Sequence, residues 1–338
     1  MLLSEYDIEL EQVVKKIIDK KYKTIGLQIP EGLKSSAFRI VNFLREKTKT
    51  TVIVIADPCY GACDVANNEY ENLGVEFILH VGHTPIPNIK ECPIPTDFIN
   101  ALSLKDINTV VKKSLSYLVG KNIGILTTSQ HLHKLNDIKR ILEKNNFNVI
   151  ISEGDKRISY EGQILGCNFS VATEILDRID SYLFIGGGNF HPLGLLLNSK
   201  KPVIVADPFT NTVRKEEIED LKDSILRQRY GAIANSKNSN KFGILVSTKR
   251  GQQRIELVNK ICKLLEKFNK EYLIISIDYI SPNSLSGFRE IDCFISTACP
   301  RIAIDDYLQY KKPIITPIEL EILLDIRKWE DYEFDQII

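Results

Sequence analysis

The stretch that decides the fold is Lys23-Thr24-Ile25-Gly26-Leu27-Gln28-Ile29-Pro30, a short apolar run closed by a proline. This pattern predicts a buried strand that ends in a turn. Residues 121–128 and 241–248 begin in a similar way, each with a lysine, a nearby glycine and an apolar run. Measured between the glycines, the separations are 98 residues (26 to 124) and 119 residues (124 to 243), so the chain contains three similar units.

Each of these stretches is followed by a polar or glycine-bearing loop, an amphipathic helix and further apolar segments. In the third unit the apolar residues between Ile255 and Phe268 recur at helical spacing. Short, apolar, non-alternating strands separated by helices indicate parallel sheets that are buried on both faces. The remaining predicted strands are 51–56, 77–81, 148–152, 181–185, 201–206, 272–277, 293–296 and 312–317.

These patterns predict an α/β protein with three similar flavodoxin-like, parallel-sheet domains around a pseudo-threefold axis. The predicted domains are residues 1–105, 106–218 and 219–338. The repeat is too long for a solenoid. Amphipathic stretches at 107–118 and 216–228 are expected to connect the units.

The composition is that of a soluble globular protein, with 43% hydrophobic and 26% charged residues. With 44 basic and 44 acidic side chains the formal charge is zero, so stable binding to nucleic acid is not expected. The first residues lack the pattern of a signal peptide, and no apolar run is long enough to span a bilayer. We therefore expect a cytoplasmic protein without a membrane partner, in which cysteines are metal ligands, catalytic groups or core residues rather than disulfides.

Three of the seven cysteines lie in predicted loops beyond strands, one in each unit: Cys63, Cys167 and Cys299. They are separated by 104 residues (63 to 167) and 132 residues (167 to 299). Ligands of open parallel sheets bind beyond the carboxyl ends of the strands. If the three units place these ends inward, the three thiols converge on one metal centre, and three scattered ligands would leave one iron of a cluster open for substrate.

The alternative for these three cysteines is that they are separate free thiols, since free cysteine is often simply buried. Zinc is the competing metal, but the chain has no close C-x2-C or H-x3-H pair. Cys59 forms a C-x3-C pair with Cys63, and Ala66 breaks the C-x3-C-x2-C signature of common radical enzymes. A passive neighbour is the favoured interpretation of Cys59 over a spare ligand or a redox partner. The cysteines best explained by packing or turns are Cys92, Cys262 and Cys293.

Polar and glycine residues at the same predicted strand ends are candidates for binding a carboxylate or phosphate of a cofactor. The histidines among them lie at equivalent strand ends of the first two units, which favours a shared cleft. Two interpretations stay open for Lys249, Arg250 and Gln252, an anion site or a solvated loop. Asp64, Asp305 and Asp306 are equally candidates for helix caps and for catalysis. The candidate cofactor-binding residues are Gln28, His83, Gln130, His131, Gly187, Gly188, His191 and Asp207.

Several motifs together resemble the archaeal 2-(3-amino-3-carboxypropyl)histidine synthase family of diphthamide biosynthesis. The similarity runs over nearly the whole chain, with its motifs in the family's order. The motifs are Tyr60-Gly61-Ala62-Cys63-Asp64, Gly162-Gln163-Ile164-Leu165-Gly166-Cys167-Asn168, Ala298-Cys299-Pro300-Arg301, Pro30-Glu31-Gly32-Leu33, Gln130-His131, Phe190-His191-Pro192-Leu193-Gly194 and Pro317-Ile318-Glu319-Leu320-Glu321-Ile322-Leu323-Leu324.

The resemblance implies a homodimer in which Cys63, Cys167 and Cys299 hold a [4Fe–4S] cluster. It implies that S-adenosylmethionine, reduced by one electron from the cluster, gives its 3-amino-3-carboxypropyl group to imidazole carbon 2 of a histidine of translation elongation factor 2. Methylthioadenosine is the other product, and an electron donor is required. The resemblance implies no catalytic residue beyond the cluster. Cys59 departs from part of the family, which leaves open which member of the C-x3-C pair is the ligand, and the Tyr-Gly-Ala-Cys motif favours Cys63.

Two other functions remain open from the sequence. Quinolinate synthase also resembles a threefold arrangement with one cluster cysteine per domain, and its cluster acts as a Lewis acid in a dehydration and condensation. A partner subunit or cluster-storage module would need no chemistry at all.

Overall fold

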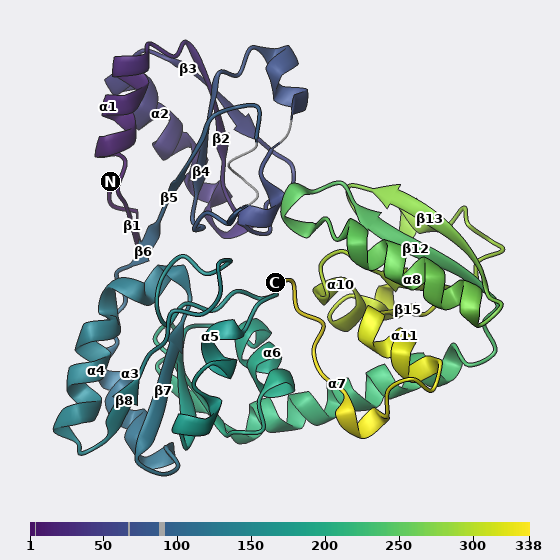
Figure 1. The fold of residues 1–338 in the computed structure, drawn as a ribbon. Coiled ribbons are helices and arrows are strands. Elements are labelled where there is room, and N and C mark those ends of the chain that lie inside the picture. The colour runs from purple at the N-terminus through teal and green to yellow at the C-terminus, as the bar shows by residue number, and fades with distance from the viewer. Residues whose placement is uncertain (4, 67, 88–91) are drawn as a thin grey trace.

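The structure is a computed structural model that describes residues 1–3, 5–66, 68–87 and 92–338. It contains three parallel sheets in separate lobes that surround a common centre, where the C-terminus also lies (Figure 1). The strand orders are β3-β2-β4-β5, β8-β7-β9-β10-β11 and β13-β12-β14-β15. In each sheet the first strand of the unit is central, with the second on one side and the third and fourth on the other. This is the flavodoxin-like order, so the predicted fold class is confirmed.

The first unit is built on β2, whose Leu27 pairs in register with Val54 on one side and Leu79 on the other. A small antiparallel sheet of β1 (Tyr6–Ile8) and β6 (Ala101–Ser103) lies beside it. The sequence prediction did not include β1, β5 or β6. The main elements are α1 (Glu11–Lys20), β2 (Thr24–Gln28), α2 (Ala37–Thr48), β3 (Thr51–Ile55), β4 (Phe77–Val81) and β5 (Thr96–Ile99).

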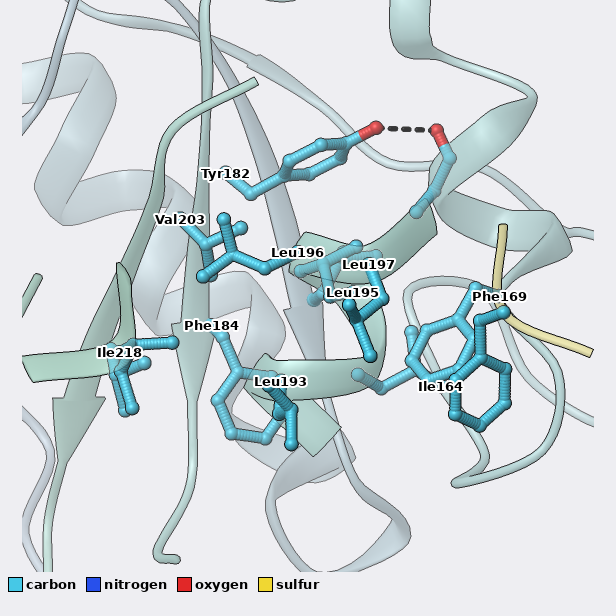
Figure 2. Close-up of a cluster of buried hydrophobic side chains, with 14 of the residues drawn as sticks. Ile164, Phe169, Tyr182, Phe184, Leu193, Leu195, Leu196, Leu197, Val203 and Ile218 are labelled. Carbon is cyan, nitrogen blue, oxygen red and sulfur yellow. Dashed lines mark hydrogen bonds between the residues drawn. The ribbon is translucent and has the colours of Figure 1, made fainter. Parts of the chain in front are cut away.

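The second unit repeats this order and adds the antiparallel edge strand β11, which was also not predicted. The hydrophobic core between its sheet and α6 includes Phe184, Leu193 and Val203 (Figure 2). Gly124 leaves little room for a side chain in its central strand, because a Cβ there would lie 2.9 Å from the Cδ1 atom of Ile175 and 3.0 Å from the ring of Tyr182. The elements are α3 (Asn108–Ser114), β7 (Asn122–Thr127), α4 (Leu135–Lys144), β8 (Asn148–Ile150), α5 (Ser170–Thr173), β9 (Ser181–Ile185), α6 (Phe190–Asn198), β10 (Val203–Asp207) and β11 (Thr212–Arg214).

The third unit follows the long helix α7, which contains the predicted boundary at 218/219 and runs from one lobe to the next (Figure 1). The predicted apolar stripe of α8 is buried at Val258, Ile261, Cys262 and Leu265. The elements are α7 (Glu216–Asn235), β12 (Lys241–Ser247), α8 (Ile255–Lys267), β13 (Glu271–Ile277), α9 (Pro282–Leu285), β14 (Cys293–Ser296), α10 (Arg301–Ile304), β15 (Ile314–Ile315) and α11 (Pro317–Leu323).

One contact holds the third unit to its own leading helix, and another joins the C-terminal segment to the second unit. Arg229 of α7 and Glu319 of α11 form a fully buried ion pair, with Nη2 and Oε2 separated by 2.6 Å. The C-terminal segment then leaves the third unit and returns to the second, where Phe334 packs edge-on against Phe169. Among the described residues no helix combines the length and the apolar character needed to cross a membrane.

Candidate functional site

Loops that follow strands of all three sheets surround a cavity of about 640 Å³. Cys63 lies in a short 3₁₀ turn after β3, Cys167 in the loop between β8 and α5, and Cys299 between β14 and α10. All three thiols line this cavity, as the arrangement of the repeats predicts. The loops at the carboxyl ends of these strands therefore meet at one cavity, the usual place of ligands in open parallel sheets.

The three thiols are free, partly buried and close enough to affect one another electrostatically. Burial, together with the neighbouring Cys167, raises the pKa of Cys63 to about 11. The pKa of Cys299 is also raised, first by burial and then by the two other thiols. Removal of a thiolate from water disfavours its charge, and a metal that binds the sulfur restores the favourable balance.

The loop after β12 closes the cavity against Cys63. Gln252 donates a hydrogen bond from Nε2 to the Sγ of Cys63 over 3.4 Å. Gly251 packs so closely that a Cβ would lie 2.3 Å from the Cα of Cys63. Lys249 is paired with Asp64 at 2.5 Å and with Asp278 at 3.2 Å. Lys249 and Gln252 therefore join the third unit to the first. Lys249 is mostly buried and lines the cavity, so it is not part of a solvated loop.

The Cys167 loop is held by residues far from it in the sequence. The backbone carbonyl of Cys167 accepts a hydrogen bond from the backbone N–H of Ile337 at 2.9 Å, so the C-terminal segment fixes this loop. Arg157 is buried beside it and donates from Nη2 to the carbonyl of Gly251 at 2.7 Å. Burial raises the pKa of Cys167, and the positive charge of Arg157 opposes that shift.

Cys299 is followed by Arg301, whose guanidinium donates to the carbonyl of Phe190 at 2.6 Å. Arg301 is also paired with Asp305, which is therefore an ion-pair partner. His191 lines the cavity next to this group, and burial together with Arg301 lowers its pKa to about 3. The imidazole of His191 is consequently neutral near pH 7.

The cavity brings together only part of the predicted cofactor-binding set. His83, Gln130, Gly187 and His191 line it, whereas the other four predicted residues do not: Gln28, His131, Gly188 and Asp207. Thus the expected clustering of all three histidines at one cleft is wrong for His131.

Each residue outside the lining is occupied elsewhere or buried. His131 is fully buried against Phe209, and its ring nitrogens have no hydrogen-bond partner within the described chain. Asp207 accepts from the backbone N–H of Phe209 at 2.8 Å and lies 3.6 Å from Arg214. Gln28 is buried beneath the loop that carries Asp64.

Sequence reasoning missed Arg157 and left Gln252 ambiguous. Arg157 belongs to a charged stretch, Glu153 to Arg157, that looks like any solvated loop. Gly251 directly before Gln252 was a usable signal, because a glycine in a loop after a central strand allows close backbone approach. The cysteines outside the cavity lining are Cys59, Cys92, Cys262 and Cys293.

The family described as "Putative diphthamide synthesis protein" has a model that matches residues 29–334. This chain belongs to the diphthamide synthesis protein family. A 2-(3-amino-3-carboxypropyl)histidine synthase of Pyrococcus horikoshii is 38% identical over 97% of this chain and 94% of its own length. A synthase of the same name from Methanocaldococcus jannaschii is 33% identical over 98% of this chain and 93% of its own.

A solved structure of a diphthamide synthesis protein has the same fold. Dph2 from Pyrococcus horikoshii, crystallised with a 4Fe-4S cluster, superposes with a TM-score of 0.90 and 35% identity. The alignment covers 99% of this chain and 95% of that one. The predicted family resemblance is therefore confirmed for the whole chain.

The residues of this cavity fit an iron–sulfur group by their donor chemistry. Cysteine thiolates are the usual protein ligands of such clusters, and three of them face one another here from three units. Three sulfurs would satisfy three irons of a four-iron cluster, and the cavity beyond them has room for a small cosubstrate.

Proposed function

We propose that this chain is an aminocarboxypropyl transferase that catalyses the first step of diphthamide biosynthesis. It transfers the 3-amino-3-carboxypropyl group of S-adenosylmethionine to imidazole carbon 2 of a histidine of translation elongation factor 2, and methylthioadenosine leaves. The observation that carries this proposal is the convergence of Cys63, Cys167 and Cys299 on one cavity in a full-length member of this family.

Cys63, Cys167 and Cys299 are the proposed ligands of a [4Fe–4S] cluster. When bound, this group supplies one electron to the sulfonium of S-adenosylmethionine. Hydrogen bonds to cluster sulfurs and nearby charges tune such centres. Gln252, which donates to the Cys63 sulfur, and the cationic Arg157, close to the Cys167 thiol, are the side chains positioned to do this.

The cavity-facing members of the predicted set are the proposed contacts of S-adenosylmethionine: His83, Gln130, Gly187 and His191. The cavity lies between three units, so a bound cosubstrate is expected to be partly shielded from water, which protects a reactive carbon fragment from side reactions. The same walls are expected to orient the target imidazole relative to the sulfonium.

Two partners follow from this activity: elongation factor 2 is the protein substrate, and an external electron donor reduces the enzyme. The homodimer is proposed from the family resemblance, and the cytoplasmic location from the sequence. A Lewis-acid dehydratase of the quinolinate synthase type would need the same three thiols, but the family comparisons favour the transferase. A storage module or partner subunit is also less favoured.

A strictly anaerobic assay tests the transferase. Iron-reconstituted protein is mixed with a chemical reductant, elongation factor 2 from a related archaeon and S-adenosylmethionine labelled in its carboxypropyl carbons. Label on the factor and methylthioadenosine, both dependent on the reductant, are the expected result. A cluster that forms but gives neither product contradicts the proposal.

A further inference from the structure

A chain of hydrogen bonds leads from the backbone below the cavity to His83 on its wall. Gln28 begins it: its Nε2 donates to the carbonyl of Asp64 at 2.7 Å, and its Oε1 accepts from the backbone N–H of Ala66 at 3.1 Å. A backbone carbonyl only accepts and a backbone N–H only donates. These two contacts therefore assign the orientation of the buried Gln28 amide.

The orientation of Gln28 fixes the tautomer of the fully buried His80. Gln28 and His80 are paired neighbours on β2 and β4, and the Oε1 of Gln28 lies 2.9 Å from the Nδ1 of His80. Since this oxygen accepts, Nδ1 of His80 carries the hydrogen. Burial, and then the neighbouring His83, hold the pKa of His80 well below its usual range, so the ring is neutral and its Nε2 is a lone pair.

The same logic fixes His83. Its Nδ1 lies 2.8 Å from the Nε2 of His80, so Nδ1 of His83 carries the hydrogen and donates it. Burial lowers the pKa of His83 to about 4, which leaves this ring neutral as well. The Nε2 of His83 is then a bare lone pair on a side chain that lines the cavity. The network thus presents a hydrogen-bond acceptor to the cavity.

The proposed reaction needs such an acceptor. The bond between the sulfonium sulfur and the carboxypropyl carbon breaks, and a carbon–carbon bond to imidazole carbon 2 forms. The hydrogen on carbon 2 must leave to restore the aromatic ring. If cleavage consumes one electron, the adduct formed on the imidazole must give one electron back to an iron–sulfur group before the ring is aromatic again. The overall transfer is therefore redox-neutral and releases one proton.

We propose that His83 is a catalytic base whose Nε2 accepts the proton released from carbon 2 of the target imidazole, with His80 and Gln28 as positioning residues. This inference rests on the proposed function. Other candidate bases are less suited. Of the carboxylates on the cavity wall, Asp278 pairs with Lys249 and Asp306 accepts a hydrogen bond from Gln309 at 3.0 Å. His191 makes no hydrogen bond in the described chain that would fix its tautomer.

A metal ion is the competing occupant of this cluster. Cys59, His80 and His83 have ligand atoms that lie within 4.8 Å of one another, and the Sγ of Cys59 is 3.8 Å from the Nε2 of His80. A metal here would replace the proton between the two rings and consume the lone pair of His80. The 2.8 Å separation of the two ring nitrogens is a hydrogen-bond distance, which favours the proton.

The test compares His83→Ala with the parent enzyme, both reconstituted with iron, and follows the two products separately. Cleavage of S-adenosylmethionine precedes proton loss, so methylthioadenosine release should stay within about twofold. Label on elongation factor 2 should fall about 100-fold, the usual contribution of a general base. Added free imidazole should restore part of the transfer. The control is His133→Ala, which removes an exposed imidazole outside the cavity lining.

Two further readouts separate the base from other roles. Iron content and visible spectrum of His83→Ala should match the parent, which excludes a folding defect. Gln28→Met should show the same split between products with a smaller effect, because its loss frees the tautomers of His80 and His83. Zinc analysis of the reconstituted parent should find less than stoichiometric metal.

The inference is overturned if both products fall together in His83→Ala, since His83 would then act in cosubstrate binding. It is also overturned by unchanged transfer, or by stoichiometric zinc that disappears in Cys59→Ser. In all of these cases the parent enzyme still labels the factor. A parent enzyme that makes neither product instead refutes the proposed function, and this inference with it.

Discussion

The side-chain amide of Gln252 donates to the sulfur of Cys63 over 3.4 Å, although the two residues belong to different units. Its neighbour Gly251 touches the backbone of Cys63, and the carbonyl of Gly251 accepts from Arg157 of the second unit. One short loop therefore contacts both other units at the cavity. The site exists only when the three units are assembled.

Loss of the Gln252 amide should change the redox properties of a bound cluster more than its formation. In Gln252→Leu we expect iron content near that of the parent and a more negative midpoint potential, because a hydrogen bond to sulfur stabilises the reduced, more negative state. A tenfold change in the equilibrium constant between the oxidised and the reduced cluster corresponds to a shift of about 59 mV in the midpoint potential of a one-electron couple. Anaerobic redox titration measures this, and an unchanged potential would show that the bond is absent in the loaded protein.

A methyl group at position 251 should be poorly tolerated. The Cβ of Gly251→Ala would lie 2.3 Å from the Cα of Cys63, and backbone cannot move aside as a flexible side chain can. We expect a loss of about 1–3 kcal/mol in unfolding free energy, as for other overpacked sites, together with reduced iron binding. Gly287→Ala is the matched control, since no atom lies within 4 Å of its Cβ position. Equal behaviour of the two variants in urea unfolding would contradict this packing argument.

The assignment of the ligands predicts a contrast between two cysteines. Cys167→Ala should fold and lose most of its iron after reconstitution, because Cys167 lines the cavity. Cys262→Ala should retain iron, because Cys262 is buried on α8 in the core of the third unit. Iron analysis with circular dichroism checks both. The opposite result, in which Cys167→Ala keeps its iron and Cys262→Ala loses it, would contradict the ligand assignment.

The buried ion pair of Arg229 and Glu319 should be intolerant of losing one partner. Arg229→Met leaves an unpaired carboxylate with no exposed surface, at a cost of about 3–5 kcal/mol. The exposed pair Lys241 and Glu290 gives the comparison, since Lys241→Ala should cost less than about 1 kcal/mol. Denaturant unfolding measures both, and similar costs would mean that the interior around Arg229 is hydrated.

At alkaline pH the unfolding free energy should depend on the buried hydroxyl of Tyr182, which donates to the carbonyl of Ala172 at 2.6 Å. Burial raises its pKa from 10.0 to about 12. The unfolded chain therefore loses this proton first, and the stability it confers is complete below pH 10 and falls as the pH approaches 12. Relative to Tyr182→Phe, the parent should lose up to about 2–3 kcal/mol over this range. If the unfolding free energies of the parent and of Tyr182→Phe change equally between pH 10 and pH 12, the raised pKa of Tyr182 is refuted.

The sequence predicted the central strands of the fold well because a strand buried on both faces is a continuous run of apolar residues, which is visible in the local sequence. The strands around Gly26, Gly124 and Gly243 lie where their apolar runs predict. By contrast β5, with Thr96 and Asp97, is partly exposed and carries no such run. Short edge strands of this kind are specified by the neighbour with which they pair, and a local pattern does not record that neighbour.

The sequence by itself determined the three repeats, the parallel sheets and the loop position of each of the three cysteines, since all of these follow from periodicity and local chain reversals. Only the tertiary structure decided which side chains serve the cavity. It buried His131 away from the cavity and placed Arg157 and Gln252 at the thiols. It also set the tautomers of His80 and His83 through Gln28. The physical reason is that hydrogen-bond partners and desolvation depend on residues brought together from distant parts of the chain, whose relative orientation no local pattern contains.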